Sequence, residues 1–283
     1  MHYLLLTTVA ILLWASLATL ASSLSHLPPF YILSLSLLIG GALSIPQWRS
    51  WQFNFKLLTV GVVGIFGYHF LLFMALRLAP TVSANLINYL WPLLILLFTP
   101  LFFNEFKLTK LHIIGVLISF IGAAMLVIGG GAGNSEQAWS FDYLLGYSLA
   151  LMAAVTWSCY SLATKKMAKF SSATVGLFCL LSGLLSLIAH NIFEPSVEIT
   201  AEQLMMITLL GLGPLGIAFY CWDSAVKKGD PRVIATLSYL TPLISTLLLT
   251  YVNDLPMSEN IIFAMLAIIF GALIANVTSL FKR

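Results

Sequence analysis

Residues 87–92 read Ile-Asn-Tyr-Leu-Trp-Pro, and residues 237–242 read Leu-Ser-Tyr-Leu-Thr-Pro. The tyrosine and the proline stand at the same places in both stretches, so Tyr89 matches Tyr239 and Pro92 matches Pro242. Working outward, and allowing one deletion, further matches pair Trp14 with Trp157, Gly61 with Gly211, Asn104-Glu105 with Asn253-Asp254, and Gly122-Ala123 with Gly271-Ala272. The sequence therefore predicts two copies of a unit about half the chain in length, as internal repeats of this kind indicate.

The composition places these copies in a membrane. The 283 residues are 60% hydrophobic and only 8% charged, with a mean hydropathy of +1.00, whereas a soluble domain carries roughly 25% charged residues. A bilayer core needs about 20 apolar residues per helix. On that basis we expect ten membrane-spanning helices, at roughly 3–21, 30–45, 57–76, 82–102, 111–130, 143–163, 171–190, 204–226, 232–251 and 259–280.

The basic residues fall on one side of this arrangement. Of the 13 Lys and Arg residues, only Arg77 lies on the other side. Basic residues next to membrane helices stay in the cytoplasm during insertion, so both termini are predicted to be cytoplasmic. The net charge of +3 reflects this loop bias, and we expect no nucleic-acid partner. The twelve cytoplasmic cations are Arg49, Lys56, Lys107, Lys110, Lys165, Lys166, Lys169, Lys227, Lys228, Arg232, Lys282 and Arg283.

A repeat with an odd number of crossings enters the membrane from the opposite face in its second copy. The loop after Asn104-Glu105 is basic, with Lys107 and Lys110, while the loop after Asn253-Asp254 carries Glu259 and no cation. We therefore expect an all-α integral membrane protein with a five-plus-five inverted-topology repeat, divided into residues 1–136 and 137–283. Inverted repeats of this kind build transporters with a binding site near the bilayer midplane.

The fourth expected span holds the densest polar and aromatic set. Asn85, Asn88, Tyr89 and Pro92 recur at helical spacing and would share one face of a continuous helix, with Trp91 beside them. Amide side chains in hydrocarbon need a partner, so they are expected to point into a cavity or into the helix bundle. The alternative is that both amides are hydrogen-bonding groups between helices.

The matched prolines, Pro92 and Pro242, lie inside expected spans. A proline frees a carbonyl and bends its helix, which suits a hinge, a gate or a cavity wall. The alternative is an ordinary membrane-helix proline, since prolines are frequent there.

Further aromatic and titratable residues lie deep in other spans. Trp14, Trp157 and Tyr160 are candidates for an aromatic wall, with an interfacial aromatic belt as the alternative. Tyr68 and His69 lie past the midpoint of the third span, where His69 could respond to protons or be a neutral, hydrogen-bonded residue.

Asp223 is the one carboxylate clearly inside a span. Lys227 follows it by one helical turn, and a snorkelling ion pair near the cytoplasmic end is the simpler explanation for both. Without a carboxylate at mid-membrane, proton coupling has no obvious carrier in the sequence.

The sequence offers no pattern for cofactor, metal or enzyme chemistry. Gly211, Gly213 and Gly216 spell GxGxxG, but no strand precedes them and Pro214 interrupts the motif. The three cysteines lie in apolar spans without ligand spacing, and the five histidines are scattered. We expect no cofactor, no metal and no enzymatic activity; the expected partners are a small-molecule substrate and the lipid bilayer, and the chain is expected to be a monomer.

Three stretches resemble one known family: Asn88-Tyr89-Leu90-Trp91-Pro92, Tyr160 through Lys166, and Ser238-Tyr239 with Thr241-Pro242. Together with the repeat and its prolines, they are similar to the EamA-like family of the drug/metabolite transporter superfamily, and within it to the aromatic amino acid exporters of bacteria. The resemblance implies an inner-membrane exporter of aromatic or other neutral amino acids that works by alternating access. The alternative is export of drug-like compounds or other small metabolites.

The resemblance also implies which residues wall a central cavity, formed by spans from both halves. It carries over a set of aromatic residues and prolines: Tyr89, Trp91, Pro92, Trp157, Tyr239 and Pro242. Asn85, Trp14 and His69 are added from their position and chemistry alone.

Overall fold

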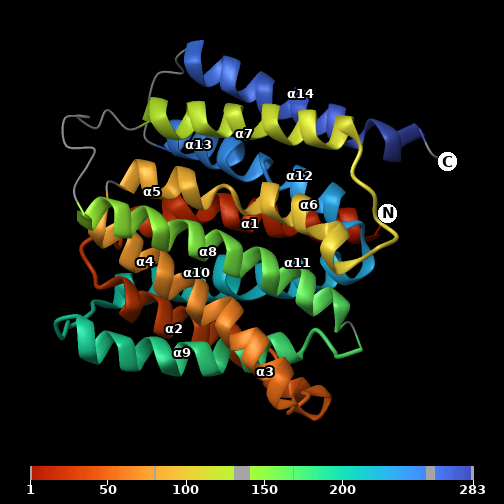
Figure 1. The fold of residues 1–283 in the computed structure, drawn as a ribbon. Helices are drawn as coiled ribbons and strands as arrows, with labels where there is room; N and C mark the ends of the chain where they lie inside the picture. The colour runs from red at the N-terminus through yellow and green to blue at the C-terminus, as the bar shows by residue number, and fades with distance from the viewer. Residues whose placement is uncertain (1, 80, 131–140, 168, 253–258, 282–283) are drawn as a thin grey trace. The chain divides into compact units, whose positions relative to one another are not determined.

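The expected all-α fold is confirmed for the part of the chain that the structure describes. The computed structural model describes residues 2–79, 81–130, 141–167, 169–252 and 259–281, which form helices and their connections and no strand (Figure 1). The α-helices are α1 (His2–Ser22), α2 (Pro29–Ala42), α3 (Phe55–Val62), α4 (Tyr68–Leu78), α5 (Thr81–Asn88), α6 (Trp91–Phe102), α7 (Lys110–Gly130), α8 (Phe141–Lys166), α9 (Thr174–Phe193), α10 (Ala201–Leu212), α11 (Ala218–Lys228), α12 (Pro231–Leu237), α13 (Leu240–Val252) and α14 (Glu259–Phe281). A short 3-10 helix, η1 (Ile45–Ser50), and two π-helical segments, η2 (Val63–Gly67) and η3 (Gly213–Ile217), complete the set.

Several of these helices have the length and composition of membrane spans. Among the described residues, four helical runs are long and apolar enough to cross a bilayer: Phe55–Leu78, Phe141–Lys166, Thr174–Phe193 and Ala201–Lys228. Shorter apolar helices occur at His2–Leu17, Pro29–Ala42, Trp91–Phe102, Lys110–Gly122 and Ile262–Ala275. Among the described residues, nine of the ten apolar spans expected from the sequence overlap one of these stretches, and the tenth, at 232–251, falls on α12 and α13.

The helices are interrupted at matched places in the two halves. The π-helical segment η2 begins at Val63, and η3 begins at Gly213, 150 residues later. Helices α5 and α12 likewise begin 150 residues apart, at Thr81 and Pro231, and each is followed by a short break and a second helix. π-Helical turns inside α-helices are rare and often lie at functional sites, so their recurrence is a local structural counterpart of the sequence repeat.

The prediction of one continuous helix through the fourth span is wrong. Helix α5 ends at Asn88 and α6 begins at Trp91, so Asn85 and Pro92 do not share a helical face. Pro92 has no N–H to donate to the Asn88 carbonyl, and it lies in the first turn of α6, where a proline is tolerated. The turn is closed instead by the amide of Leu90, which donates to the Ile87 carbonyl at 3.1 Å.

Pro242 stands at the same kind of break. Helix α12 ends at Leu237 and α13 begins at Leu240, so Pro242 also occupies a first helical turn. Pro242 has no N–H to donate to the Ser238 carbonyl, and this carbonyl instead accepts a hydrogen bond from the Thr241 amide at 3.0 Å. Both matched prolines thus divide a span into two helices.

The chain folds into two compact units, each built from both halves of the sequence. Unit one comprises residues 1–70 and 163–228, and unit two comprises residues 71–162 and 229–283. Within unit one, α2 packs against α9 and α1 against α11. Within unit two, α7 packs against α14 and α6 against α12. The division into residues 1–136 and 137–283 is a statement about the repeat and stays a prediction.

Close helix packing in both units depends on small residues. A Cβ on Gly40 of α2 would lie 2.7 Å from the Leu215 carbonyl oxygen in unit one. In unit two, a Cβ on Gly115 of α7 would lie 2.5 Å from the Gly271 carbonyl oxygen of α14. Such approaches are typical of membrane helices, whose backbones come together where side chains are small.

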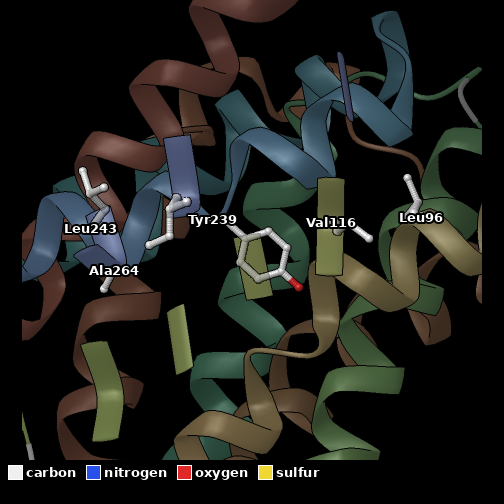
Figure 2. Packing of buried hydrophobic residues seen from close by; sticks show 6 residues of the cluster. Leu96, Val116, Tyr239, Leu243 and Ala264 are labelled. Atoms are coloured by element: carbon white, nitrogen blue, oxygen red, sulfur yellow. The ribbon is translucent and has the colours of Figure 1, made fainter. Parts of the chain in front are cut away.

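A hydrophobic cluster forms part of the core of unit two. Its buried members come from α6, α7, α13, α14 and the break after α12: Leu96, Val116, Tyr239, Leu243, Ala264 and Ile268. Figure 2 shows the Tyr239 ring among these side chains, with Val116 and Leu96 on one side of the view and Leu243 and Ala264 on the other. The matched tyrosine of the second half is therefore a core residue of this unit.

Candidate functional site

Unit one holds an aromatic group around Trp14. The Trp14 ring lies 5.2 Å from the ring of Trp222 and 6.2 Å from that of Phe219, so α1 and α11 meet through aromatic side chains. The indole Nε1 of Trp14 donates to the Pro214 carbonyl in the π-helical segment η3 at 3.1 Å. A partly buried indole is amphipathic and needs such a partner. The π-helical segment thus fixes the orientation of Trp14.

His69 and Tyr68 belong to the same unit and come directly after the other π-helical segment. His69 is buried, and its Nδ1 lies 2.7 Å from the Ile65 carbonyl oxygen. Because a carbonyl only accepts hydrogen bonds, Nδ1 carries a proton. The His69 ring lies 6.2 Å from Phe219 and 4.8 Å from Tyr68. Phe219 therefore connects His69 to the group around Trp14.

Unit two holds a second aromatic group, around Trp157. Its ring lies 6.4 Å from that of Trp91 in an edge-to-face arrangement and 5.3 Å from that of Tyr160. All three side chains are buried. The Ser158 hydroxyl of α8 donates to the Trp91 carbonyl at 3.0 Å, which holds the first residue of α6 against α8. Burial of all three rings argues against an interfacial belt, in which they would face lipid.

The remaining residues of the fourth span lie at the break that precedes Trp91. Asn88 is buried at the end of α5, while Asn85 and Tyr89 are half-buried. The Tyr89 amide donates to the Asn85 carbonyl at 2.9 Å, so Tyr89 is positioned by the last turn of α5.

Among the residues predicted to contact the substrate, Tyr239 has surroundings typical of a core residue. It is completely buried in the hydrophobic cluster of Figure 2, where its hydroxyl lies beside the backbone of Leu93 and its ring packs 6.5 Å from that of Phe120. These contacts are packing contacts within unit two. Pro242 follows Tyr239 by three residues and is buried in the first turn of α13.

Sequence reasoning missed Phe219 and Trp222. They stand three residues apart on one face of α11, immediately after η3, and both are buried against Trp14. The signal that would have found them is their spacing: aromatic residues at i and i+3, following a Gly-Pro segment, share a helical face.

Asp223 and Lys227 form an ion pair, but it is not a snorkelling one. The Lys227 ammonium lies 2.6 Å from the Asp223 carboxylate, and the two side chains are 8% and 1% exposed. The same carboxylate oxygen accepts a hydrogen bond from the Ser172 hydroxyl at 2.6 Å. Lys227 also donates to the Phe170 carbonyl at 3.1 Å and lies 3.2 Å from the centre of the Phe170 ring. The pair is thus buried within unit one, because the connection between α8 and α9 covers it.

Among the described residues, no three His, Cys, Asp or Glu side chains gather in a group that could hold a metal ion. The two aromatic groups and their amides and hydroxyls offer stacking surfaces and hydrogen bonds. These are means of binding a small molecule.

The EamA-like transporter family matches residues 1–128 and 144–277. The chain belongs to this family. It is 39% identical over 274 residues to the aromatic amino acid exporter YddG of Ancylobacter novellus, a match that covers 94% of each chain. It is 31% identical to the protein of the same name from Escherichia coli, over 90% of this chain and 89% of that one.

A solved crystal structure has the same fold, with a TM-score of 0.92, 37% identity and coverage of 99% of this chain and 98% of the other. Membership of the EamA-like family confirms the resemblance seen in the sequence. It identifies the chain as a multi-pass membrane transporter of small molecules and not an enzyme.

Proposed function

We propose that this protein exports aromatic or other neutral amino acids across the inner membrane by alternating access. The observation that carries the proposal is the 39% identity, over 94% of both chains, to a relative named as an aromatic amino acid exporter. Two buried aromatic groups, around Trp14 in unit one and Trp157 in unit two, support it. Indole and phenol rings stack on aromatic substrates, and neighbouring Trp faces attract an ammonium group.

The proposed topology is ten crossings in two inverted halves, residues 1–136 and 137–283, with both termini in the cytoplasm. The matched positions of η2 and η3 support the repeat, as does the match of the family to the separate segments 1–128 and 144–277. Single cysteines at positions 107 and 259, in a chain freed of its three native cysteines, test the inverted sense. A membrane-impermeant thiol reagent is expected to reach them from opposite sides, and labelling from the same side would exclude the topology.

The proposed substrate contacts are the residues named from the sequence. The aromatic candidates are Trp14, Tyr68, His69, Tyr89, Trp91, Trp157, Tyr160 and Tyr239. Asn85 and Asn88 are proposed to offer amide hydrogen bonds to the substrate. Pro92 and Pro242 are proposed to act as hinges, because each divides a span into two helices.

Transport in sealed membrane vesicles tests the function. Labelled Phe, Trp, Tyr, Thr and Met are offered with and without a pH gradient, and an aromatic amino acid is expected to be transported. Trp91→Ala is expected to weaken transport while the protein stays folded. Phe103→Ala is the matched control, since it also truncates an aromatic ring of unit two but packs against Phe102 and Phe106, which are not among the proposed contacts. Absence of transport for all five amino acids would exclude the assignment.

Export of a drug-like compound or another small metabolite is the alternative within the family. Its support is the unassigned substrate of several relatives, such as the uncharacterized transporter of Acidianus ambivalens, which is 27% identical over 76% of this chain. A shift in melting temperature across a panel of amino acids and amphipathic compounds separates the two functions, because a ligand that binds only the folded state stabilises it.

A further inference from the structure

The segment between α2 and α3, together with the first two residues of α3, exposes aromatic and basic side chains. It contains η1 and the extended residues that follow it, and Trp48, Phe53 and Phe55 are 55%, 68% and 85% exposed. Arg49 and Lys56 are exposed beside them. We name these five residues the aromatic–basic patch. In Figure 1 this segment is the dark orange turn that leads into the start of α3.

The polar groups of this segment are used to hold it in place. The Trp51 indole donates to the Ser44 hydroxyl at 3.1 Å, and the backbone N–H of Gln52 donates to the Thr174 hydroxyl at 3.3 Å. The Asn54 carboxamide oxygen accepts from the Leu57 amide at 3.1 Å and caps the start of α3. The segment is therefore fixed to unit one by its polar groups, while its large aromatic side chains face outward. This is the reverse of an ordinary solvated loop.

The charge of the patch has one sign. The chain contains no Asp or Glu before Glu105, so no acid lies in the patch or in the two helices that flank it. The Arg49 guanidinium lies 5.8 Å from the centre of the Trp48 ring, which leaves its charge next to an apolar face. A surface that exposes aromatic rings and cations, without acidic side chains, is complementary to the face of a lipid bilayer. There the apolar acyl chains lie directly beneath negatively charged phosphates.

From these observations we propose that the aromatic–basic patch binds anionic phospholipid headgroups. The rings of Trp48, Phe53 and Phe55 enter the boundary between headgroups and acyl chains, and Arg49 and Lys56 contact the phosphates. Trp is favoured at that depth, and juxtamembrane basic residues are attracted to the negatively charged cytoplasmic leaflet. The proposal rests on the cytoplasmic placement of this segment in the proposed topology, and it adds a lipid-binding surface to the transporter.

Native mass spectrometry of the full chain in detergent tests the proposal. The purified protein is titrated with phosphatidylglycerol or with phosphatidylcholine of the same acyl chains. A basic residue near an anionic surface contributes about 1 kcal/mol, or about five-fold in affinity. Arg49→Gln with Lys56→Gln is therefore expected to weaken phosphatidylglycerol binding by about 30-fold at low ionic strength, and phosphatidylcholine binding is expected to stay unchanged.

Lys107→Gln with Lys110→Gln is the matched control. It also removes two exposed cations from the proposed cytoplasmic side, but these lie outside the patch. The control is expected to keep phosphatidylglycerol binding within two-fold of the wild type. Equal losses in both double variants, or no loss in the first, would overturn the proposal.

The aromatic side chains are tested by Phe53→Ser with Phe55→Ser, which changes two exposed rings and leaves the core intact. This variant is expected to retain less of both lipids, and unchanged retention overturns the role of the rings. The same spectra report the oligomeric state. A dimer of the wild type that the patch variants abolish would make the patch an interface between copies of this chain and overturn lipid binding. Lipid occupancy is measured without transport, so either result leaves the proposed export function to its own test.

Discussion

The buried pair of Asp223 and Lys227 gives the sharpest test of the packing in unit one. Removing one partner of a buried ion pair costs about 3–5 kcal/mol, because the other charge stays buried without compensation. The contacts of each side chain predict which of the two single variants loses more stability. In Asp223→Asn, Lys227 keeps its hydrogen bond to the Phe170 carbonyl and its place over the Phe170 ring, so its loss is expected near 3 kcal/mol.

Lys227→Met is expected to be the more damaging change. Asp223 would keep only the Ser172 hydroxyl as a donor, since its Oδ1 atom has no hydrogen-bond partner among the described residues. A carboxylate that is 1% exposed then costs close to 5 kcal/mol. Combining Asp223→Asn with Lys227→Met removes both charges, and replacing a buried pair by neutral groups of similar size is often nearly neutral. The double variant is therefore expected to be more stable than either single variant.

Thermal unfolding of the purified protein in detergent, followed by tryptophan fluorescence, measures these differences. One kcal/mol corresponds to about 2–4 °C for chains of 150–250 residues, so the single variants are expected to melt roughly 6–20 °C below the wild type. Lys228→Gln is the control, because it removes an exposed cation next to Lys227 on α11, and surface substitutions usually change stability by no more than about 0.5 kcal/mol. Single losses that simply add in the double variant would refute the reasoning, as would losses no larger than that of the control.

Three further changes test other contacts. Gly115→Ala is expected to lower stability in thermal unfolding by about 1–3 kcal/mol, because its Cβ would meet the backbone of α14. Gly67→Ala is the control and should be tolerated, because its Cβ would lie 3.6 Å from the Val63 side chain. Equal losses in the two variants would contradict the close packing of α7 on α14. Glu194→Gln is expected to lower stability by about 1–2 kcal/mol, because the buried carboxylate accepts the amides of Phe30 and Tyr31 at the start of α2; an unchanged melting temperature would show that the cap contributes nothing. Trp14→Phe keeps a ring but removes the donor to the Pro214 carbonyl, so it should cost about 1 kcal/mol and weaken transport, and wild-type values of both would exclude that role.

Local features of the fold could be predicted from the sequence, because the relevant physics acts along the chain. The lengths of the apolar stretches indicated where the helices lie. The missing N–H groups of Pro92 and Pro242 indicated that the helical hydrogen bonding of two spans is interrupted. The sequence did not show that these spans are divided into separate helices. Whether a chain bends at a proline or ends one helix and begins another depends on which neighbouring elements satisfy the freed carbonyls.

Contacts that join distant segments could not be predicted. Phe219 and Trp222 contact Trp14, from which they are separated by about 200 residues in the sequence. No local sequence pattern predicts that contact. The pair of Asp223 and Lys227 could be read from its spacing, but its burial depends on the connection between α8 and α9. Tyr239 matches Tyr89 in the repeat, yet it packs in a hydrophobic cluster, because a repeat preserves positions in the sequence and the surroundings of each copy are set by its own neighbours.

If the proposed repeat holds, the packing of equivalent helices predicts that the two halves of this sequence depend on each other. Helix α2 and helix α9 correspond to the second expected span of each proposed half, and they pack together in unit one. Helices α7 and α14 contain the fifth expected span of each proposed half, and they pack together in unit two, with Gly115 and Gly271 in close backbone contact. Each half alone would leave these small-residue surfaces uncovered. In lipid, where apolar surface gives no driving force for association, close packing of small residues is a main source of stability. The proposed repeat is therefore a unit of sequence, while each compact unit combines one segment from the N-terminal part of the chain with one from the C-terminal part.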